Sequence, residues 1–211
     1  MSNPGWSHAE SPFHAGEIAI QERLGVRTKM ESQGRRVIRD YLTEQHRQFF
    51  AQRPFLIAGT VDAKGRPWAS ILIGEPGFLS TPDERTLHIA SKPLFGDPLN
   101  ETLTEGIDIG LLGIELPTRR RNRMNGTVEV VTSKGFVVQV GQSFGNCPQY
   151  IQARTVELID DLKDLTVPKP TTLIETLGQL ERAMITTADT FFIATAFRDN
   201  ANLIQGVDVS H

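Results

Sequence analysis

A chain of 211 residues with 39% hydrophobic and 22% charged residues is long enough for one well-packed domain. No apolar run could span a bilayer and no basic start precedes an apolar core, so we expect a cytoplasmic protein that does not contact membranes. The single cysteine, Cys147, excludes an internal disulfide and a multi-thiolate metal site, and we predict no metal. A net charge of −3 argues against a nucleic-acid-binding protein.

The N-terminal part, residues 1–53, is predicted to be a helical segment packed on the main domain. Residues 16–25 carry apolar side chains at helical spacing and end in a glycine, which predicts a short helix. The polar stretch 28–36 is expected to be a loop. Whatever these segments contribute to function, packing is the simplest role for them.

A second helix is predicted over residues 44–52, where Thr43 can cap the first turn. Phe49 and Phe50 should dock this helix onto the sheet. His46 lies in the same helix, but no second histidine or carboxylate stands at the spacing of a metal site, so we expect it at the surface.

A β-hairpin is predicted from two strands, 55–61 and 68–73, which are rich in β-branched and aromatic residues and flank turn residues at 62–67. Both faces of the second strand are largely apolar, which suggests a strand covered on both sides, as in a barrel or at a subunit interface. Small side chains beside Trp68 leave room for a flat group against the backbone. Plain barrel core is the competing interpretation.

A third strand is predicted over residues 86–90, and Ser91 and Lys92 follow directly at its end. A hydroxyl followed by an ammonium group could bind a phosphate there, although a solvated strand end is an equally good interpretation. Asp97 is expected to cap a helix that ends at Gly106, and residues 107–112 form the next predicted strand.

Four arginines occupy five positions within residues 119–123. Such a cluster favours an anionic partner, because like charges held together repel. Arg121 and Arg123 would face the same side at the start of the next strand, where planar guanidinium groups could hold a phosphate. A nucleic-acid patch and a solvated turn with one ion pair are the alternatives, and we prefer the compact anion site.

The rest of the chain predicts a second hairpin over 127–131 and 135–140, followed by a short helix at Pro148. Cys147 could be nucleophilic at that helix start, but with no histidine nearby in the sequence a structural role is favoured. The remaining predicted segments are a charged linker over 160–169, a helix over 173–185 with a capping box at Thr172 and Glu175 that should pack on the barrel, and two strands at 190–197 and 206–211.

Four motifs carry a family resemblance: HAGEIAIQERLG at 14–25, WASILI at 68–73, RRRNRMNG at 119–126 and GNCPQYIQAR at 145–154. On these motifs the chain resembles the pyridoxamine 5'-phosphate oxidase-like proteins, and specifically a less characterised branch of them. The likeness runs from about residue 14 to residue 211. It implies a mainly β fold, an antiparallel FMN-binding split barrel over 54–211 with peripheral helices, in agreement with the pattern of short hairpin-linked strands.

In that family FMN lies across a homodimer interface, so the resemblance implies FMN as cofactor and a second copy of the chain as partner. It places backbone groups of the second strand along the flavin ring and the end of the third strand near the phosphate. Ser210 and His211 would reach the partner's cofactor. The implied cofactor-binding residues are Trp68, Ala69, Ser70, Ile71, Ile89, Ala90, Ser91, Lys92, Arg121, Arg123, Asn146, Cys147, Tyr150, Ser210 and His211.

Three departures from the vitamin B6 oxidases argue against oxidation of pyridoxine phosphate. Those enzymes carry a basic residue where Trp68 stands, a longer basic strand end than Ser91 and Lys92, and a C-terminal substrate-binding segment that has no counterpart here. We therefore expect an FMN-dependent oxidoreductase of unknown substrate, with NAD(P)H as a candidate electron donor. The alternative is a flavin-binding protein without turnover of its own. Tyr150 and His211 are candidate proton donors, and no catalytic acid or base is assigned.

Overall fold

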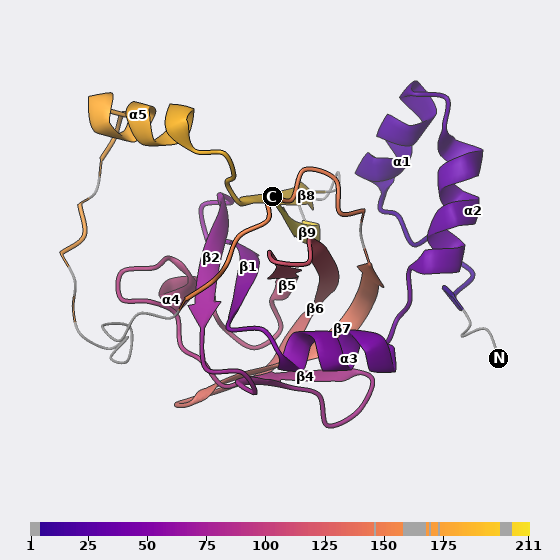
Figure 1. Cartoon of the computed structure of the whole chain (residues 1–211). Helices are drawn as coiled ribbons and strands as arrows, with labels where there is room; N and C mark the ends of the chain where they lie inside the picture. The colour runs from indigo at the N-terminus through magenta and orange to yellow at the C-terminus, as the bar shows by residue number, and fades with distance from the viewer. Residues whose placement is uncertain (1–4, 146, 158–167, 169, 173, 199–203) are drawn as a thin grey trace.

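The computed structural model describes residues 5–145, 147–157, 168, 170–172, 174–198 and 204–211. Its centre is an antiparallel sheet of seven strands in the order β2-β1-β5-β6-β7-β4-β3, with a separate two-stranded ribbon, β8-β9 (Figure 1). The strands are β1 Phe55–Val61, β2 Pro67–Ile73, β3 Leu79–Ser80, β4 Thr86–Ile89, β5 Asp108–Glu115, β6 Arg120–Thr132, β7 Gly135–Gly145, β8 Ile193–Arg198 and β9 Ile204–Ser210. The helices are α1 Ala15–Arg23, α2 Arg27–Val37, α3 Glu44–Ala51, α4 Leu99–Thr102 and α5 Gln179–Thr187.

The architecture is the mainly β split barrel that the sequence predicts. The β1–β2 hairpin pairs from Phe55 with Ile73 to Val61 with Pro67. Past the end of β4, the Ser91 hydroxyl donates to the carbonyl of Ile73 at 2.7 Å. This contact places the end of β4 beside the end of β2, although the two strands lie far apart in the strand order. The enclosed core consists of fully buried aliphatic and aromatic side chains, among them Leu56, Leu72, Leu87, Ile109, Leu111 and Val138.

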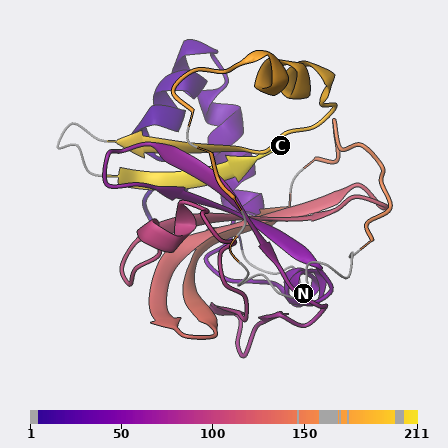
Figure 2. The ribbon, with the colours of Figure 1, turned by 90° about the vertical axis from the view of Figure 1, so that its left-hand side faces the viewer.

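The β8–β9 ribbon packs on the outer face of the sheet, beside β1 and β2 (Figure 2). Ile57 and Leu112 on that face form a second apolar cluster with Val209 of β9. The close approach requires a residue without a side chain, because a Cβ added at Gly110 would lie 2.4 Å from the carbonyl oxygen of Val207. The ribbon is thereby fixed over the middle of the sheet, and it positions the last residues of the chain.

The loop predicted over residues 28–36 is wrong, because this segment is helix α2. Glu31 forms ion pairs at helical spacing with Arg27 at 2.7 Å and with Arg35 at 2.6 Å. Such (i, i+4) pairs support a helix that has no apolar stripe. A prediction based on hydrophobic periodicity cannot detect a helix of this kind.

The predicted helix at 44–52 is confirmed as α3, with the Thr43 hydroxyl accepting from the backbone N–H of His46 at 3.3 Å. Phe49 and Phe50 are buried against the sheet, as expected. His46 is also buried, so its predicted surface position is wrong. Its Nδ1 lies 3.4 Å from the Ser143 hydroxyl on β7.

Two helices predicted in the C-terminal third differ from the structure. Pro148 starts a turn and no helix, because Tyr150 adopts a left-handed φ of 72° and ends helical geometry there. Helix α5 begins at Gln179, after Gly178 as N-cap, and the residues predicted to form a capping box lie upstream of it. Leu173 and the predicted linker 160–169, except Pro168, lie outside the described residues.

Helix α5 also fails to pack on the barrel as predicted. None of its residues is buried, and it stands apart from the sheet (Figure 1). Its apolar side chains, including Leu180 and Met184, face solvent in the single chain. Within the described part of the chain, no helix is both long and apolar enough to cross a membrane.

Candidate functional site

Two arginines of β6 meet the end of β9 on the outer face of the sheet. Arg121 and Arg123 alternate with inward-facing residues, so their side chains lie on the same side, as predicted. Arg121 Nη1 lies 2.6 Å from His211 Nδ1, and Arg123 Nη2 donates to the Ser210 hydroxyl at 2.5 Å. We call these four residues the guanidinium cluster.

The guanidinium cluster contains hydrogen-bonding atoms that have no partner. The Nε atoms of Arg121 and Arg123 and the Nε2 atom of His211 are buried without a partner. Among the described residues, no carboxylate lies within ion-pairing distance of either arginine. Burial, followed by repulsion from Arg123, lowers the pKa of Arg121. Burial and the two arginines likewise lower the pKa of His211. An anion placed here would relieve both effects.

The predicted residues on β2 divide between the two faces of the sheet. Ser70 is buried and its hydroxyl donates to Asp97 Oδ1 at 2.6 Å. Trp68 Nε1 donates to Asp62 Oδ2 at 3.0 Å, which ties the indole to the hairpin turn. Ala69 is exposed and Ile71 is half-buried on the outer face.

The outer-face residues of β2 share a sheet surface with the guanidinium cluster. Ile71 pairs with Ile57, Ile57 pairs with Leu112, and Leu112 pairs with Arg123. Paired residues project on the same face, so Ile71 and Arg123 lie in one row, separated by three strand spacings or about 14 Å along the sheet. The last residues of β9 lie against this row.

The remaining predicted residues lie at the strand ends. Ile89 is buried in the barrel core, whereas Ala90 and Lys92 are exposed. Cys147 is exposed. Tyr150 is 80% exposed in the single chain. Asn146 lies outside the described residues.

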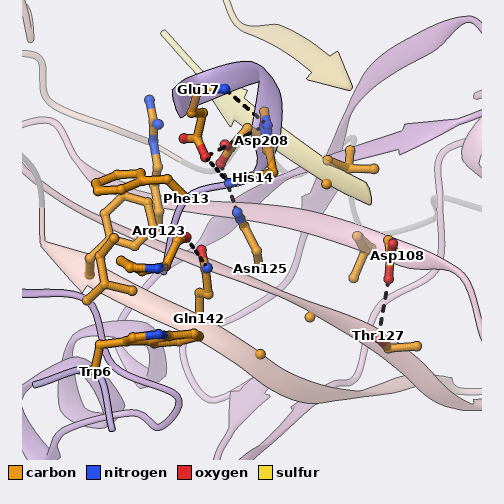
Figure 3. Close-up of a pocket in the computed structure, with 18 residues that line it drawn as sticks. Trp6, Phe13, His14, Glu17, Asp108, Arg123, Asn125, Thr127, Gln142 and Asp208 are labelled. Atoms are coloured by element: carbon orange, nitrogen blue, oxygen red, sulfur yellow. Dashed lines mark hydrogen bonds and ion pairs between the residues drawn. The ribbon is translucent and has the colours of Figure 1, made fainter. Parts of the chain in front are cut away.

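A cavity of about 410 Å³ opens beside the guanidinium cluster, between the N-terminal segment and the outer face of β6 and β7 (Figure 3). We call it the N-terminal cavity. Its floor is formed by alternate residues of β6, and Arg123 belongs both to this floor and to the cluster. The other side chains that line it include Trp6, Phe13, His14, Glu17, Asp108, Asn125, Thr127, Gln142, Phe144 and Asp208.

Most polar groups of the N-terminal cavity are held by hydrogen bonds. His14 caps α1: its Nδ1 accepts from the Glu17 N–H at 3.2 Å, and the Glu17 carboxylate accepts from the His14 N–H at 3.0 Å. Asn125 Nδ2 donates to Asp208 Oδ1 at 3.0 Å, while its Oδ1 is buried without a partner. Burial raises the pKa of Glu17.

Sequence reasoning missed the N-terminal cavity because its residues come from six segments that are distant in the sequence. One signal was available: Asn125 stands two positions after Arg123, so the alternation that pairs Arg121 with Arg123 extends to it. The cap formed by His14 with Glu17 was missed because histidine is not among the favoured N-cap residues.

Comparisons with known proteins address the fold and the family. A family model described as pyridoxamine 5'-phosphate oxidase matches residues 42–160, which is more than half of the chain. A solved structure of a tagged variant of HupZ from Group A Streptococcus is similar at 14% identity and a TM-score of 0.40, over 50% of this chain and 99% of that one. No curated protein matches. From the family match, the chain belongs to the pyridoxamine 5'-phosphate oxidase family.

Proposed function

We propose that this protein is an FMN-dependent oxidoreductase that works as a homodimer. The observation that carries the proposal is the guanidinium cluster, whose buried donors lack an acidic partner and whose Arg123 lies in the same sheet row as Ile71. Membership of the family supports a flavin as the ligand, and the resemblance on WASILI and RRRNRMNG supports these two strands as its site. The substrate lies outside the proposal.

The residues present fit the requirements of FMN. The phosphate is a dianion, and Arg121 and Arg123 supply cationic donors for it; the exposed Lys92 at the end of β4 is a further cation, which only the family resemblance places near the phosphate. Small Ala69 on the outer face leaves the backbone of β2 open to a flat ring, because its methyl group covers little of the strand. Ser91 is the weaker candidate of the two strand-end residues, since its hydroxyl already donates to Ile73.

Bound FMN supplies hydride or electron transfer, and the residues of the chain bind and orient it. Arg121 Nη1 can only donate, so His211 Nδ1 must be the acceptor of their hydrogen bond. Neutral His211 therefore carries its proton on Nε2, the atom that is buried without a partner. In this role His211 donates Nε2–H to an acceptor atom of the ligand and holds the ligand against Arg121.

A homodimer is supported by apolar surface that the single chain leaves uncovered. β2 is an edge strand of the sheet, and Ala69 on its outer face is exposed. Leu180, Met184 and Ile185 of α5 are exposed at 73%, 68% and 58%. A helix of nine residues is too short to be stable without packing, so a second chain is the proposed cover.

The second candidate function is a flavin-binding protein without turnover. It is favoured by the hydroxyls of Ser70 and Ser91, both of which are engaged in structural hydrogen bonds and are therefore not available for proton transfer.

In the oxidoreductase proposal NADH or NADPH is the electron donor.

Absorption spectroscopy separates these candidates. Protein purified with FMN should be yellow, and NADH or NADPH should bleach the flavin band if the protein is an oxidoreductase. A yellow protein that neither nicotinamide reduces would favour the binding protein. A protein that takes up no FMN would contradict both.

A further inference from the structure

The N-terminal cavity has a wall that is fixed to the rest of the chain. The Trp6 N–H donates to the carbonyl of Arg35 at 2.8 Å, and Gln142 Nε2 donates to the carbonyl of Pro12 at 2.7 Å. The Arg35 guanidinium donates to the carbonyls of His8 and Ala9 at 2.9 and 2.8 Å. A segment tied to both α2 and β7 keeps the space open, and about 410 Å³ lies within the usual range for small-molecule sites.

Aromatic side chains form the apolar part of the cavity. Trp6, Phe13 and Phe144 line it and are each half-buried, so part of each ring remains available to a ligand. Flat rings pack on such walls by offset stacking or edge contacts. The walls therefore suit a planar ligand.

The polar part of the cavity offers both acceptors and a donor. Glu17 and Asp208 present carboxylates on one side, and Figure 3 shows them gathered near His14. Arg123 Nε is a donor without a partner, and Asn125 Oδ1 is an acceptor without a partner. The two β6 residues stand on the same face about 6.6 Å apart. A ligand that satisfies them needs an N–H edge beside a carbonyl oxygen.

The charges exclude a strongly anionic ligand. Glu17, Asp108 and Asp208 line the cavity, against the single guanidinium of Arg123. A phosphate would meet these carboxylates, so a nucleotide or FMN is disfavoured here and a free base is favoured. Asp108 accepts from the Thr127 hydroxyl at 3.3 Å and lies away from Glu17 and Asp208 in the cavity (Figure 3), so the two carboxylates that lie together are the acceptors assigned to the ligand.

We propose that the N-terminal cavity binds a small planar heterocycle, of the oxopurine or pterin type, that donates N–H groups to Glu17 and Asp208 and accepts from Arg123. This site adjoins the flavin site proposed above and shares Arg123 with it, whereas Glu17 and Asp208 belong to the cavity alone. Its ligand is a neutral ring, whereas the guanidinium cluster is built for an anion.

Fluorescence of Trp6 tests the proposal directly. The chain has two tryptophans, so a Trp68→Phe variant leaves Trp6 as the single reporter. Hypoxanthine, an oxopurine with N–H groups, should change the Trp6 emission saturably. Caffeine, whose ring nitrogens carry no N–H, should give no saturable change. Absence of a saturable change with hypoxanthine, or an equal response to caffeine, would overturn the proposal.

Matched substitutions locate the site. In the same background Glu17→Gln and Asp208→Asn should each weaken hypoxanthine binding about tenfold or more, because each removes a charged acceptor. Glu22→Gln, on an exposed part of α1, should leave binding unchanged. Two variants are made so that the test still stands if only one of them folds. Circular dichroism shows which of them is folded. Wild-type affinity in a folded Glu17→Gln or Asp208→Asn variant would overturn the proposal.

Calorimetry on the wild-type protein separates this inference from the proposed function. Because the two sites share only Arg123, hypoxanthine should still bind saturably to FMN-saturated protein. Mutually exclusive binding of hypoxanthine and FMN would show that the cavity is the flavin site and would overturn the inference. Binding of FMN without hypoxanthine would contradict the inference alone, and binding of hypoxanthine without FMN would contradict the proposed function alone.

Discussion

Arg121 Nη1 lies 2.6 Å from His211 Nδ1, so a residue at the start of β6 is joined to the last residue of the chain. In the proposed function this pair holds the anionic end of FMN. Arg121→Ala should weaken FMN binding about tenfold or more, because a charge-assisted contact is lost. Flavin fluorescence titration measures the change. Arg120→Ala is the control, since Arg120 lies over the Phe49 ring on the opposite face of β6.

Removing a second cationic group should release the cofactor without unfolding the protein. The double variant Arg121→Ala with Lys92→Ala should lose FMN during purification while remaining dimeric, because neither side chain belongs to the apolar core. Gel filtration and the visible spectrum measure the two properties. Full flavin retention in the double variant would mean that the phosphate is bound elsewhere.

His46 predicts a pH dependence of stability. Burial, with help from the charges of Arg39 and Arg120, lowers its pKa from 6.5 to about 4. Between pH 6.5 and about 4, His46 is protonated in the unfolded chain but neutral in the folded one. The free energy of unfolding should therefore fall as the pH drops from about 7 to 4. The contribution of this residue is on the order of 3 kcal/mol.

The His46→Gln variant isolates that contribution. Its free energy of unfolding, from urea titrations at about pH 7 and pH 4.5, should fall less than that of the wild type, because glutamine does not titrate. An equal fall in both proteins would show that His46 is not kept neutral by the fold.

The packing of β9 on the sheet depends on the absence of a side chain at Gly110. A Cβ at this position would lie 2.4 Å from the Val207 carbonyl oxygen, so Gly110→Ala should destabilise the protein by about 2 kcal/mol. FMN affinity should fall in the same variant, because Ser210 and His211 are carried by β9. Gly141→Ala is the control, since its Cβ would meet its nearest neighbour at an ordinary 3.4 Å. Equal stability of the two variants, from urea titrations, would contradict the packing argument.

The exposed face of α5 predicts the behaviour of the proposed homodimer. Leu180→Ser with Met184→Ser should raise the dimer dissociation constant at least about tenfold, because apolar area is no longer buried between chains. Sedimentation equilibrium measures this constant. Arg182→Ser, on the same helix, should leave it within about twofold. Unaltered dimerisation of the double variant would remove α5 from the interface.

Local rules predicted the hairpins and the shared face of Arg121 and Arg123. Turn residues and the two-residue period of a strand depend only on neighbours in the sequence, and these features are confirmed. The family resemblance alone put Ser210 and His211 among the candidate residues. Their contact with the two arginines could not be derived from the sequence, because it depends on β8 and β9 packing over β1 and β5.

Other features could not be predicted because distant residues determine them. His46 is buried by a strand that carries Ser143, almost a hundred positions later. Helix α2 carries the ion pairs of Glu31 at helical spacing, a pattern that hydrophobic periodicity does not detect. The N-terminal cavity requires Trp6 to meet β7, and no pattern in either segment indicates the other.

The most direct test of the central claim is a titration of the purified protein with FMN, followed by its absorption spectrum and by sedimentation. We predict saturable binding of one FMN per chain to a dimer, abolished or weakened in Arg121→Ala and preserved in Arg120→Ala. A chain that stays monomeric and leaves the FMN spectrum unchanged would contradict the account.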